Sequence, residues 1–443
     1  MSSPGPAGDG PGRRLFRDTW PMLFGVVSLL GFQLVDSAFI GQLGVAPLAA
    51  LGFTLPMQQL IIGFQVGLGI ATTAVVARTL GAGDPARARR LSGLVVVAGA
   101  LAVALVCGAL WFARAPLVSA LGAEPELLPL IRAFWIPWLL SAWCGAVLYF
   151  GYSVMRAHGD MRTPGAWMVV TSLINLVLDP VYIFVFGWGL PGAAWATVTA
   201  FGIGIAAVYP ALVRRRLLHL QLLTINPLPA LAQLGAITVP AMSSQLMPPV
   251  AAMLATGLVA GFGADAVAAW GLGTRLEFFS LVVVLALTMS LPPTVSRLLG
   301  AGEIEAIRQV VGIAVRFILL WQIGVALLWL ILSGVLTRLL TGDPGVGAIL
   351  GEYLLLVPPS YAALGVCMLM VSVCNALGLP MRALVISLLR LFACYLPLLW
   401  AGAQLGGLTG LLAGAMLGNL LAGLTAWALY RDAMGRGLTG AAG

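Results

Sequence analysis

The sequence predicts an all-α integral membrane protein with twelve transmembrane helices in two six-helix lobes. Hydrophobic residues make up 60% of the 443 positions and charged residues only 9%, against roughly 25% charged residues in a soluble domain. The mean hydropathy is +1.03. At about 20 apolar residues per span, the chain accommodates around twelve helices. The apolar runs are long and continuous, which argues against the short alternating segments of a transmembrane barrel.

The apolar runs also place the individual spans. In the first half we expect them at about 15–40, 48–77, 91–113, 126–155, 163–187 and 191–213. In the second half we expect them at about 230–260, 267–297, 307–333, 348–375, 381–402 and 407–430. This predicts a disordered cytoplasmic tail over 1–14, an N-lobe over 15–213, a cytoplasmic linker over 214–229, a C-lobe over 230–431 and a C-terminal tail over 432–443.

The arginines predict the orientation. All 23 basic residues are arginine, and most fall in the segments on one side of this topology. The opposite side holds or adjoins only Arg114, Arg132 and Arg338. Because positive loops stay inside, both termini are expected in the cytoplasm, with the chain in the plasma (inner) membrane. The net charge of +8 is explained by this asymmetry and does not indicate a nucleic-acid partner.

The two halves are an internal repeat. Residues 43–52 align with 262–271, 78–84 with 297–303, and 157–159 with 376–378, without gaps. The numbering offset is 219 each time, since 263−44, 297−78 and 376−157 are equal. Both halves have an even number of spans, so they insert in the same orientation, as parallel repeats do. We expect a two-lobed, monomeric carrier working by alternating access; a duplicated channel or membrane enzyme is the alternative.

Two carboxylates lie deep in the apolar runs of the first half, Asp36 and Asp179. A charge at the membrane centre costs about 2.5–3.5 kcal/mol on insertion scales, so it is rarely kept without a use. In the second half, the repeat places Ala, Cys and Leu at the positions equivalent to Asp36, Asn175 and Asp179. Because the second half lacks these groups, a scaffold shared by both lobes does not require them, and a function confined to the N-lobe is favoured.

Polar neighbours predict that these carboxylates form a site. Asn175 and Asp179 are four residues apart and share one helical face with Thr171. Further polar side chains lie on the first span (Gln33, Ser37) and the sixth (Thr197, Thr199). Burial and a neighbouring carboxylate both disfavour the ionised form, so one of the pair should bind a proton readily. The same oxygens suit Na⁺. The alternative is a helix-to-helix hydrogen bond, worth only about 0.6 kcal/mol.

Two prolines are candidate hinges. Pro180 cannot donate to the carbonyl of Leu176, so it is expected to kink the fifth span. Pro21 follows Asp18 and Thr19 and has two interpretations. It is either a residue of the first helical turn behind a cap or a bending point that repositions Asp36.

A further set of side chains is a candidate substrate cleft. Arg275 and Glu277 point about 200° apart around the eighth span, so they are not expected to pair with each other. They either meet substrate charge or lie near the outer interface, where Arg extends to the headgroups. Soft and amide side chains complete the set: Gln33, Met57, Gln58, Gln65, Met242 and Gln245. Such a lining suits amphipathic cations, although residues of this kind more often serve only packing.

Other chemistry is not indicated. There is no Walker A, HExxH or GxSxG motif, so we expect neither an enzyme nor a nucleotide-driven pump, and no cofactor. His158 and His219 are not expected to bind a metal by themselves, and the five cysteines lie inside apolar runs without a disulfide pattern. The energy is expected to come from an ion gradient, worth about 2.3 kcal/mol per charge per 100 mV.

Several motifs together resemble the multidrug and toxic-compound extrusion (MATE) family, in its DinF-like branch. They lie at 35–44, 81–84, 159–164, 175–180, 187–197, 275–277 and 300–302. The resemblance covers about 15–431 and implies export of cationic or lipophilic compounds in exchange for H⁺ or Na⁺. It also implies a cation site at Asp36, Asn175 and Asp179, with Thr197 as a further ligand, and a bend at Pro21.

One position departs from the family pattern. Relatives can carry a tyrosine on the fourth span facing the cation site, where this chain offers Phe134. The carboxylates that the other main branch carries in its second lobe are not evident. Two alternatives remain: a lipid-linked oligosaccharide flippase of the same superfamily, and an intramembrane enzyme using Asp36 and Asp179.

Overall fold

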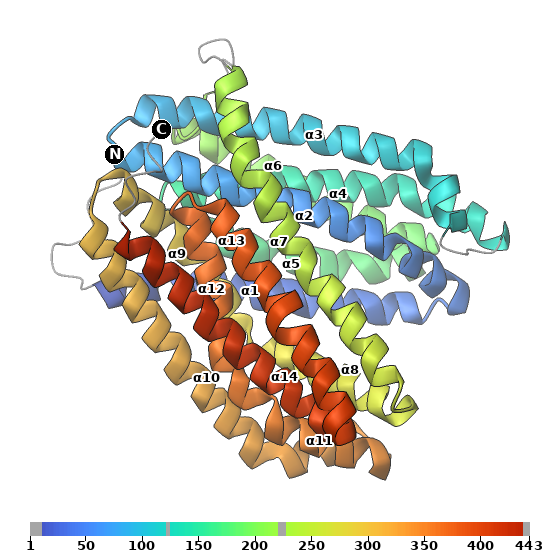
Figure 1. Ribbon diagram of the computed structural model, residues 1–443. Coiled ribbons are helices and arrows are strands. Elements are labelled where there is room, and N and C mark those ends of the chain that lie inside the picture. The colour runs from blue at the N-terminus through green and yellow to red at the C-terminus, as the bar shows by residue number, and fades with distance from the viewer. Residues whose placement is uncertain (1–10, 121–124, 220–226, 437–443) are drawn as a thin grey trace. The chain divides into compact units, whose positions relative to one another are not determined.

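The computed structural model describes residues 11–120, 125–219 and 227–436, which form helices joined by short turns (Figure 1). The first half contains α1 (Pro11–Gly41), α2 (Val45–Gly81), α3 (Pro85–Ala120), η1 (Pro125–Leu127), α4 (Leu128–Ala157), α5 (Arg162–Pro180), the π-helical segment η2 (Val181–Val185) and α6 (Gly189–Arg214). Each of the six spans predicted here corresponds to one long helix, with η2 continuing α5.

Interrupted helices are more frequent in the second half. It contains α7 (Pro227–Ala260), α8 (Ala264–Ser280), α9 (Val282–Gly300), α10 (Ile304–Leu340), α11 (Pro344–Leu356), η4 (Pro358–Ser360), α12 (Tyr361–Ala376), α13 (Pro380–Leu388), the π-helical segment η5 (Leu389–Tyr395) and α14 (Leu396–Gly435). The eighth span is therefore α8 with α9, and the tenth is α11 with α12.

The last two predicted spans meet inside α14, which is a hairpin of two helices. Gly406 and Gly407 leave the helical region there, and the positive φ of 61° at Gly407 suits glycine. A Cβ built on Gly402 or on Gly410 would lie 2.1 Å from the carbonyl oxygen of the other. The two arms thus pack backbone against backbone. Ten helical stretches have the length and apolar composition of a span; with both arms of α14 counted and α7 added, the described residues supply the twelve predicted spans.

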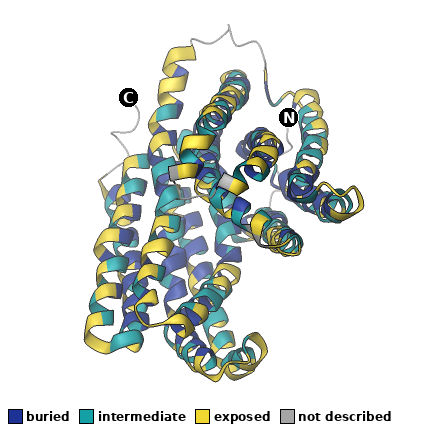
Figure 2. Cartoon of the chain, turned by 90° about the vertical axis from the view of Figure 1, so that its right-hand side faces the viewer, coloured by how far each residue is buried: buried dark blue, intermediate teal, exposed yellow. Residues whose placement is uncertain are grey.

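The chain divides into two compact units. The N-terminal unit comprises Arg17–Met242 and Ser296–Gly302. The C-terminal unit comprises Ser243–Val295, Glu303–Gly443 and the part of Met1–Phe16 that the structure describes. In the first, α4 packs against α2, α3 and α6; in the second, α12 packs against α10 and α14. Figure 2 colours the buried residues of the helices dark blue; they include Trp135 and Phe150 on α4 and Leu369 and Met370 on α12.

The turns repeat with the sequence. The turn before α2 contains Gly44 with φ 105°, and the turn before α8 contains Gly263 with φ 100°. Two further pairs of turns match in the same way, Gly83 (83°) with Gly302 (77°) and Gly159 (88°) with Gly378 (73°). Each pair is related by the offset of the sequence repeat. A left-handed conformation that strongly favours glycine is therefore repeated at the same three points, so the repeat is one of structure as well as sequence.

Candidate functional site

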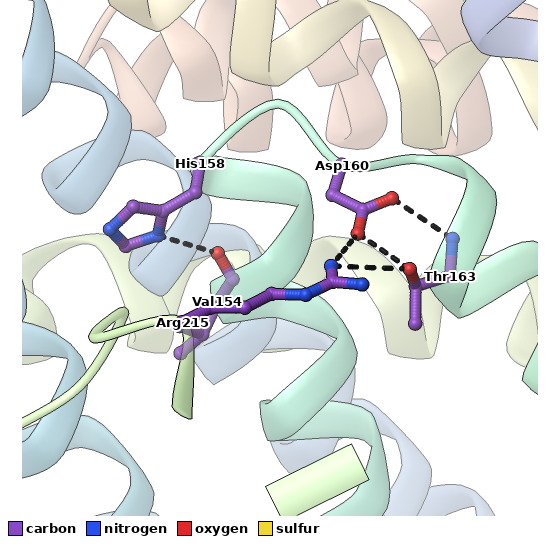
Figure 3. Close-up of polar contacts among 5 residues, drawn as sticks. All are labelled: Val154, His158, Asp160, Thr163 and Arg215. Carbon is purple, nitrogen blue, oxygen red and sulfur yellow. Dashed lines mark hydrogen bonds and ion pairs between the residues drawn. The ribbon is translucent and has the colours of Figure 1, made fainter. Parts of the chain in front are cut away.

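The start of α5 is fixed by Asp160, which lies in the turn after α4 (Figure 3). Its Oδ1 accepts from the backbone N–H of Thr163 at 2.9 Å, and its Oδ2 accepts from the Thr163 hydroxyl at 2.6 Å. A carboxylate in this position satisfies a free N–H group of the first helical turn. Arg215, from the end of α6, donates to the same Oδ2 at 2.6 Å. These contacts hold the N-terminal end of α5, the helix that carries Asn175 and Asp179.

Three of the predicted site residues meet where α5 packs against α6. Asp179 is fully buried and Asn175 is 1% exposed. The Asn175 amide lies 2.9 Å from Thr197 Oγ1, and when its nitrogen faces Asp179 it donates to the two carboxylate oxygens at 2.8 and 2.9 Å. The Thr197 hydroxyl also lies 3.1 Å from the carbonyl oxygen of Ala193. Asn175 and Asp179, four residues apart on α5, therefore form one cluster with Thr197 of α6, the sixth span.

The fourth predicted residue, Asp36 on α1, faces this cluster. Its carboxylate is close enough to interact electrostatically with Asp179. Its Oδ1 is buried and has no hydrogen-bond partner in the part of the chain that the structure describes. A buried carboxylate oxygen without a donor is costly, and it is a natural ligand for a proton or a hard cation. The oxygens of Asp36, Asp179, Asn175 and Thr197 are the type that Na⁺ prefers.

Of the remaining polar residues predicted nearby, three bond to their own helix. Thr171 donates to the carbonyl of Trp167 at 2.7 Å, Ser37 to that of Gln33 at 2.8 Å, and Thr199 to that of Trp195 at 2.9 Å. These are local bonds within one helix; the Thr199 hydroxyl also lies 3.4 Å from the hydroxyl of Tyr182 in η2. Phe134 is 3% exposed and stacks on Trp138, with 6.4 Å between ring centroids.

The prolines interrupt or stiffen the helices that carry the cluster. α5 ends at Pro180 and continues as the π-helical η2, because proline lacks the N–H that an α-helix needs there. Pro21 lies inside α1, well after the helix begins at Pro11. The interpretation of Pro21 as a first-turn residue is therefore wrong. The helix begins at Pro11 and already includes Arg13 and Arg17, so Pro21 lies more than two turns from its start.

Small residues bring α1 and α5 together at Pro21, a feature that the sequence analysis did not identify. A Cβ on Gly165 would lie 2.4 Å from the carbonyl oxygen of Pro21, and one on Gly25 would lie 3.1 Å from Cβ of Met168. The two backbones therefore touch at Pro21. A small residue on each of the two facing helices is the sequence signal that could have indicated this crossing.

The residues predicted for a substrate cleft are distributed over both units. Gln33, Met57, Gln58, Gln65 and Met242 belong to the N-terminal unit, and Gln245, Arg275 and Glu277 to the C-terminal unit. Met57 is 6% exposed, so it is a packing residue in this structure. Arg275 is exposed, while Glu277 accepts a hydrogen bond from Tyr353 at 3.3 Å. The cleft itself stays a prediction.

These observations define a class of protein. A duplicated bundle of twelve membrane-spanning helices, with a carboxylate cluster buried in one half, is the architecture of a secondary transporter.

The particular family follows from a family model. The MatE model matches residues 21–181 and again 240–400, two segments whose first and last positions are related by the offset of the internal repeat. The chain belongs to the MATE family of transporters, which confirms the predicted family and the prediction that it is not an enzyme.

Solved structures agree with this assignment. The MATE transporter VcmN of Vibrio cholerae in its bent form is 54% identical, with a TM-score of 0.94, and the match covers 96% of this chain and 97% of that one. An outward-facing MATE transporter of the MOP superfamily is only 21% identical but superimposes with a TM-score of 0.92, over 97% of both chains. The two-lobed MATE fold of twelve helices is thereby confirmed.

Curated relatives have varied names. A protein of Shewanella oneidensis named FAD transporter is 33% identical over 426 residues, covering 94% of each chain. A probable multidrug resistance protein of Bacillus subtilis, YpnP, is 23% identical over 427 residues, covering 95% of this chain and 94% of its own.

Proposed function

We propose that this protein is a secondary active efflux antiporter, which exports cationic or lipophilic compounds in exchange for H⁺ or Na⁺. The observation that carries the proposal is the fully buried carboxylate of Asp179, bonded by Asn175 and facing the charge of Asp36. Two carboxylates in one buried site are unfavourable together unless a cation joins them. The coupling ion is that cation.

Ion binding changes the balance of forces between α1 and α5. Without the ion, the carboxylates of Asp36 and Asp179 repel each other across the two helices. With a proton or Na⁺ bound, the repulsion is removed and the helices are drawn together. The two helices touch at Pro21 and Gly165, so a change at Asp36 is expected to turn α1 about that crossing. Alternating access then follows from a shift between two arrangements that bind the ion with different affinity.

Transport in proteoliposomes tests the proposal. Wild type, Asp36→Asn and Asp179→Asn are reconstituted, and extrusion of a cationic dye is followed under an imposed pH or Na⁺ gradient. We expect both variants to lose gradient-driven extrusion by at least about tenfold, the loss of one ion interaction worth about 1.4 kcal/mol. Asp84→Asn, an exposed inner carboxylate that bonds only the N–H of Arg87 in the described structure, is the control and should transport normally.

The same assay separates the ions. If Na⁺ is the coupling ion, a Na⁺ gradient at equal pH on both sides drives extrusion, and if H⁺ is, only the pH gradient does. Wild-type rates and an unchanged ion dependence in both Asn variants would remove the coupling site from Asp36 and Asp179. Extrusion that persists after both gradients are collapsed would contradict secondary transport itself.

A second substrate class is favoured by one relative. The 33% identical protein of Shewanella oneidensis is named FAD transporter, and FAD is an anionic dinucleotide with a planar flavin ring. We propose flavin dinucleotide export as the second candidate. Counterflow separates the two: proteoliposomes loaded with FAD or with ethidium are assayed for exchange with the labelled compound. Exchange of FAD with no competition by ethidium would replace the cationic class by this one.

A further inference from the structure

Two segments that are far apart in the sequence bring six arginines to one end of the N-terminal unit. The backbone N–H of His219, after α6, donates to the carbonyl oxygen of Arg89 in α3 at 3.0 Å. The carbonyl oxygen of His219 also occupies the space in which Gly93 of α3 would carry a Cβ. The start of α3 and the end of α6 thereby form one basic patch of six residues: Arg87, Arg89, Arg90, Arg214, Arg215 and Arg216.

Two arginines of the basic patch have partners inside the unit. Arg215 forms an ion pair with Asp160, with 2.6 Å between Nη1 and Oδ2 (Figure 3), and Arg89 is close enough to His158 to act on it electrostatically. The other four are the half-exposed Arg90 and the exposed Arg87, Arg214 and Arg216. In the part of the chain that the structure describes, none of these three exposed arginines is joined to an acid by an ion pair. Their charge is therefore directed to the surroundings of the protein.

The stability of α3 does not explain its arginines. The first turn of a helix carries a partial positive charge, so cations are unfavourable there. The first turn of α3 contains no acid, and the carboxylate of Asp84 before it accepts from the backbone N–H of Arg87 at 2.9 Å. The end of α6 differs, because Arg214 lies in the last turn, where the partial charge of a helix is negative. The arginines of α3 are therefore stabilised only by a negative partner.

The internal repeat shows that the fold does not require the basic patch. The offset of 219 places Arg308 at the position of Arg89, and its guanidinium donates to the carbonyl oxygen of Met434 at 3.0 Å. This position thus joins the start of one span to the last span of its unit in both halves. The other five arginines correspond to uncharged residues of the second half: Ala306, Gln309, Ala433, Met434 and Gly435. Five of the six charges are therefore dispensable for the shared architecture.

The arginines of α3 lie on the side of the helix that faces lipid. Leu101 and Leu105 are 61% and 75% exposed within a membrane span, so they contact acyl chains. Arg90 precedes Leu101 by about three turns, on the same helical face. Arg87 precedes Leu105 by about five turns, again on that face. Because the apolar run that follows is long enough to cross a hydrocarbon core of about 30 Å, both arginines lie at the level of the headgroups.

The end of α6 has the same arrangement. Ile203 is 42% exposed within the membrane span, and Arg214 follows it by about three turns on the same helical face. Both helices therefore carry an arginine at headgroup level in line with an apolar, lipid-facing surface. This combination matches a molecule that has a negative head and apolar chains.

We propose that the basic patch binds the phosphate group of an anionic phospholipid on the side of the membrane predicted to be cytoplasmic. Arginine recognises phosphate by charge and by two parallel hydrogen bonds, and basic residues beside a membrane attract its anionic lipids. The exposed leucines of α3 continue the site along the acyl chains, which a free phosphate ion lacks. This lipid site depends neither on the coupling ion nor on the exported compound.

Native mass spectrometry of the full-length protein in detergent tests the proposal. Dioleoylphosphatidylglycerol or dioleoylphosphatidylcholine is titrated in, and the fraction of protein with bound lipid is measured. We expect wild type to bind phosphatidylglycerol at least about tenfold more tightly, since each arginine near an anionic headgroup contributes about fivefold. The triple variant Arg87→Gln, Arg90→Gln, Arg214→Gln should bind the two lipids equally. Unchanged preference in this variant would overturn the proposal.

A second triple variant removes the same charge from three other exposed arginines: Arg132→Gln, Arg338→Gln, Arg431→Gln. It should keep the wild-type preference. Equal loss in both triple variants would show an effect of net charge alone and contradict the site. Displacement of phosphatidylglycerol by inorganic phosphate at the same concentration would make the free ion the ligand and also overturn the proposal.

Wild type alone provides a further test, which stands even if the patch variant does not fold. Its preference for phosphatidylglycerol should fall as the ionic strength rises from about 0.1 to about 1 M, because the screening length shortens from about 10 to about 3 Å. A preference that does not change with salt would exclude recognition by exposed arginines. Because lipid binding is measured without transport, failure of the Asp36–Asp179 coupling site would leave these results unaffected.

Discussion

Gly81 and Gly300 pack reciprocally, each against the backbone of the other's helix. A Cβ on Gly81 would lie 2.0 Å from the carbonyl oxygen of Arg297, and one on Gly300 would lie 2.1 Å from that of Arg78. The two glycines occupy equivalent positions in the repeat and end α2 and α9. The C-terminal ends of two repeat-related helices thus cross at a point where only glycine fits. Both carbonyls also accept the capping N–H groups of Ala82 and Ala301.

This crossing predicts that substitutions at Gly81 and Gly300, which lie far apart in the sequence, lower the stability by similar amounts. Gly81→Ala and Gly300→Ala each insert a methyl group into occupied space, so each should destabilise the arrangement by about 1–3 kcal/mol, and by similar amounts. Thermal unfolding in detergent and dye transport measure this. Gly108→Ala is the control, since nothing lies within 4 Å of its Cβ position in α3 and helical alanine is favoured. Equal stability of all three variants would contradict the crossing.

Thr197→Val is expected to weaken binding of the coupling ion. It removes the hydroxyl that lies 2.9 Å from the Asn175 amide while keeping the shape of the side chain. A lost hydrogen bond of about 1 kcal/mol corresponds to roughly fivefold weaker affinity, visible as a higher ion concentration for half-maximal transport. Thr197→Ser keeps the hydroxyl and should behave as wild type. Thr199→Val, two residues further along α6, should leave the ion dependence unchanged. An unchanged ion dependence in Thr197→Val would exclude Thr197 as a ligand.

Gly165→Ala is expected to disturb coupling from a distance. Its methyl group would lie 2.4 Å from the carbonyl oxygen of Pro21, so α1 must move away from α5 where the hinge is predicted. Transport should fall while the carboxylates stay intact. Gly202→Ala on α6, with open space at its Cβ position, is the comparison. If Gly165→Ala transports as well as Gly202→Ala with the same ion dependence, the contact at Pro21 has no role in the cycle.

His158 predicts a loss of stability in acid. It follows the end of α4, where its Nδ1 lies 2.9 Å from the carbonyl oxygen of Val154. Burial, and then the nearby positive charges of Arg297 and Arg89, hold the pKa of His158 below its ordinary value of 6.5, against the opposing effect of the Val154 bond. The folded state therefore binds fewer protons than the unfolded state, and the contribution present above pH 6.5 is lost as the pH falls.

His158→Gln removes this titration. Melting temperatures of wild type and variant are measured in detergent above and below the ordinary pKa of histidine, and we expect the wild type to lose more stability on acidification than the variant. The carboxylates titrate equally in both proteins, so the difference between them isolates the histidine. Parallel pH profiles would mean that His158 is charged or solvated in the folded state.

Part of the site could be predicted from single positions. The cost of a charge in an apolar run singled out Asp36 and Asp179, and the four-residue helical spacing added Asn175. The repeat then showed that all three are absent from the second half. Only the family resemblance separates Thr197 from Thr199, because a hydroxyl in an apolar helix carries little signal of its own. The span count was predicted from the apolar runs, the parallel repeat from aligned segments, and the family from the resemblance of several motifs.

The remaining features depend on contacts between distant segments. The crossings at Gly81–Gly300 and Pro21–Gly165 require two backbones to approach each other. The sequence does not distinguish a glycine packed against another backbone from a glycine with open space beside it. Glu277 was singled out from the sequence, but its partners lie on later helices of the chain, and only packing brings them to it.

The two kinds of feature differ for a physical reason. Membrane class and buried charges can be read from single residues, because the cost of removing a group from water is a property of that residue. The repeat can be read by comparing segments of the sequence with each other. The partners of the buried charges cannot be read in this way, because hydrogen bonds and close contacts depend on distance in space. Asp36 and Glu277 can thus be singled out in the sequence, while the contact between Asn175 and Thr197 and the bond from Tyr353 to Glu277 exist only in the folded chain.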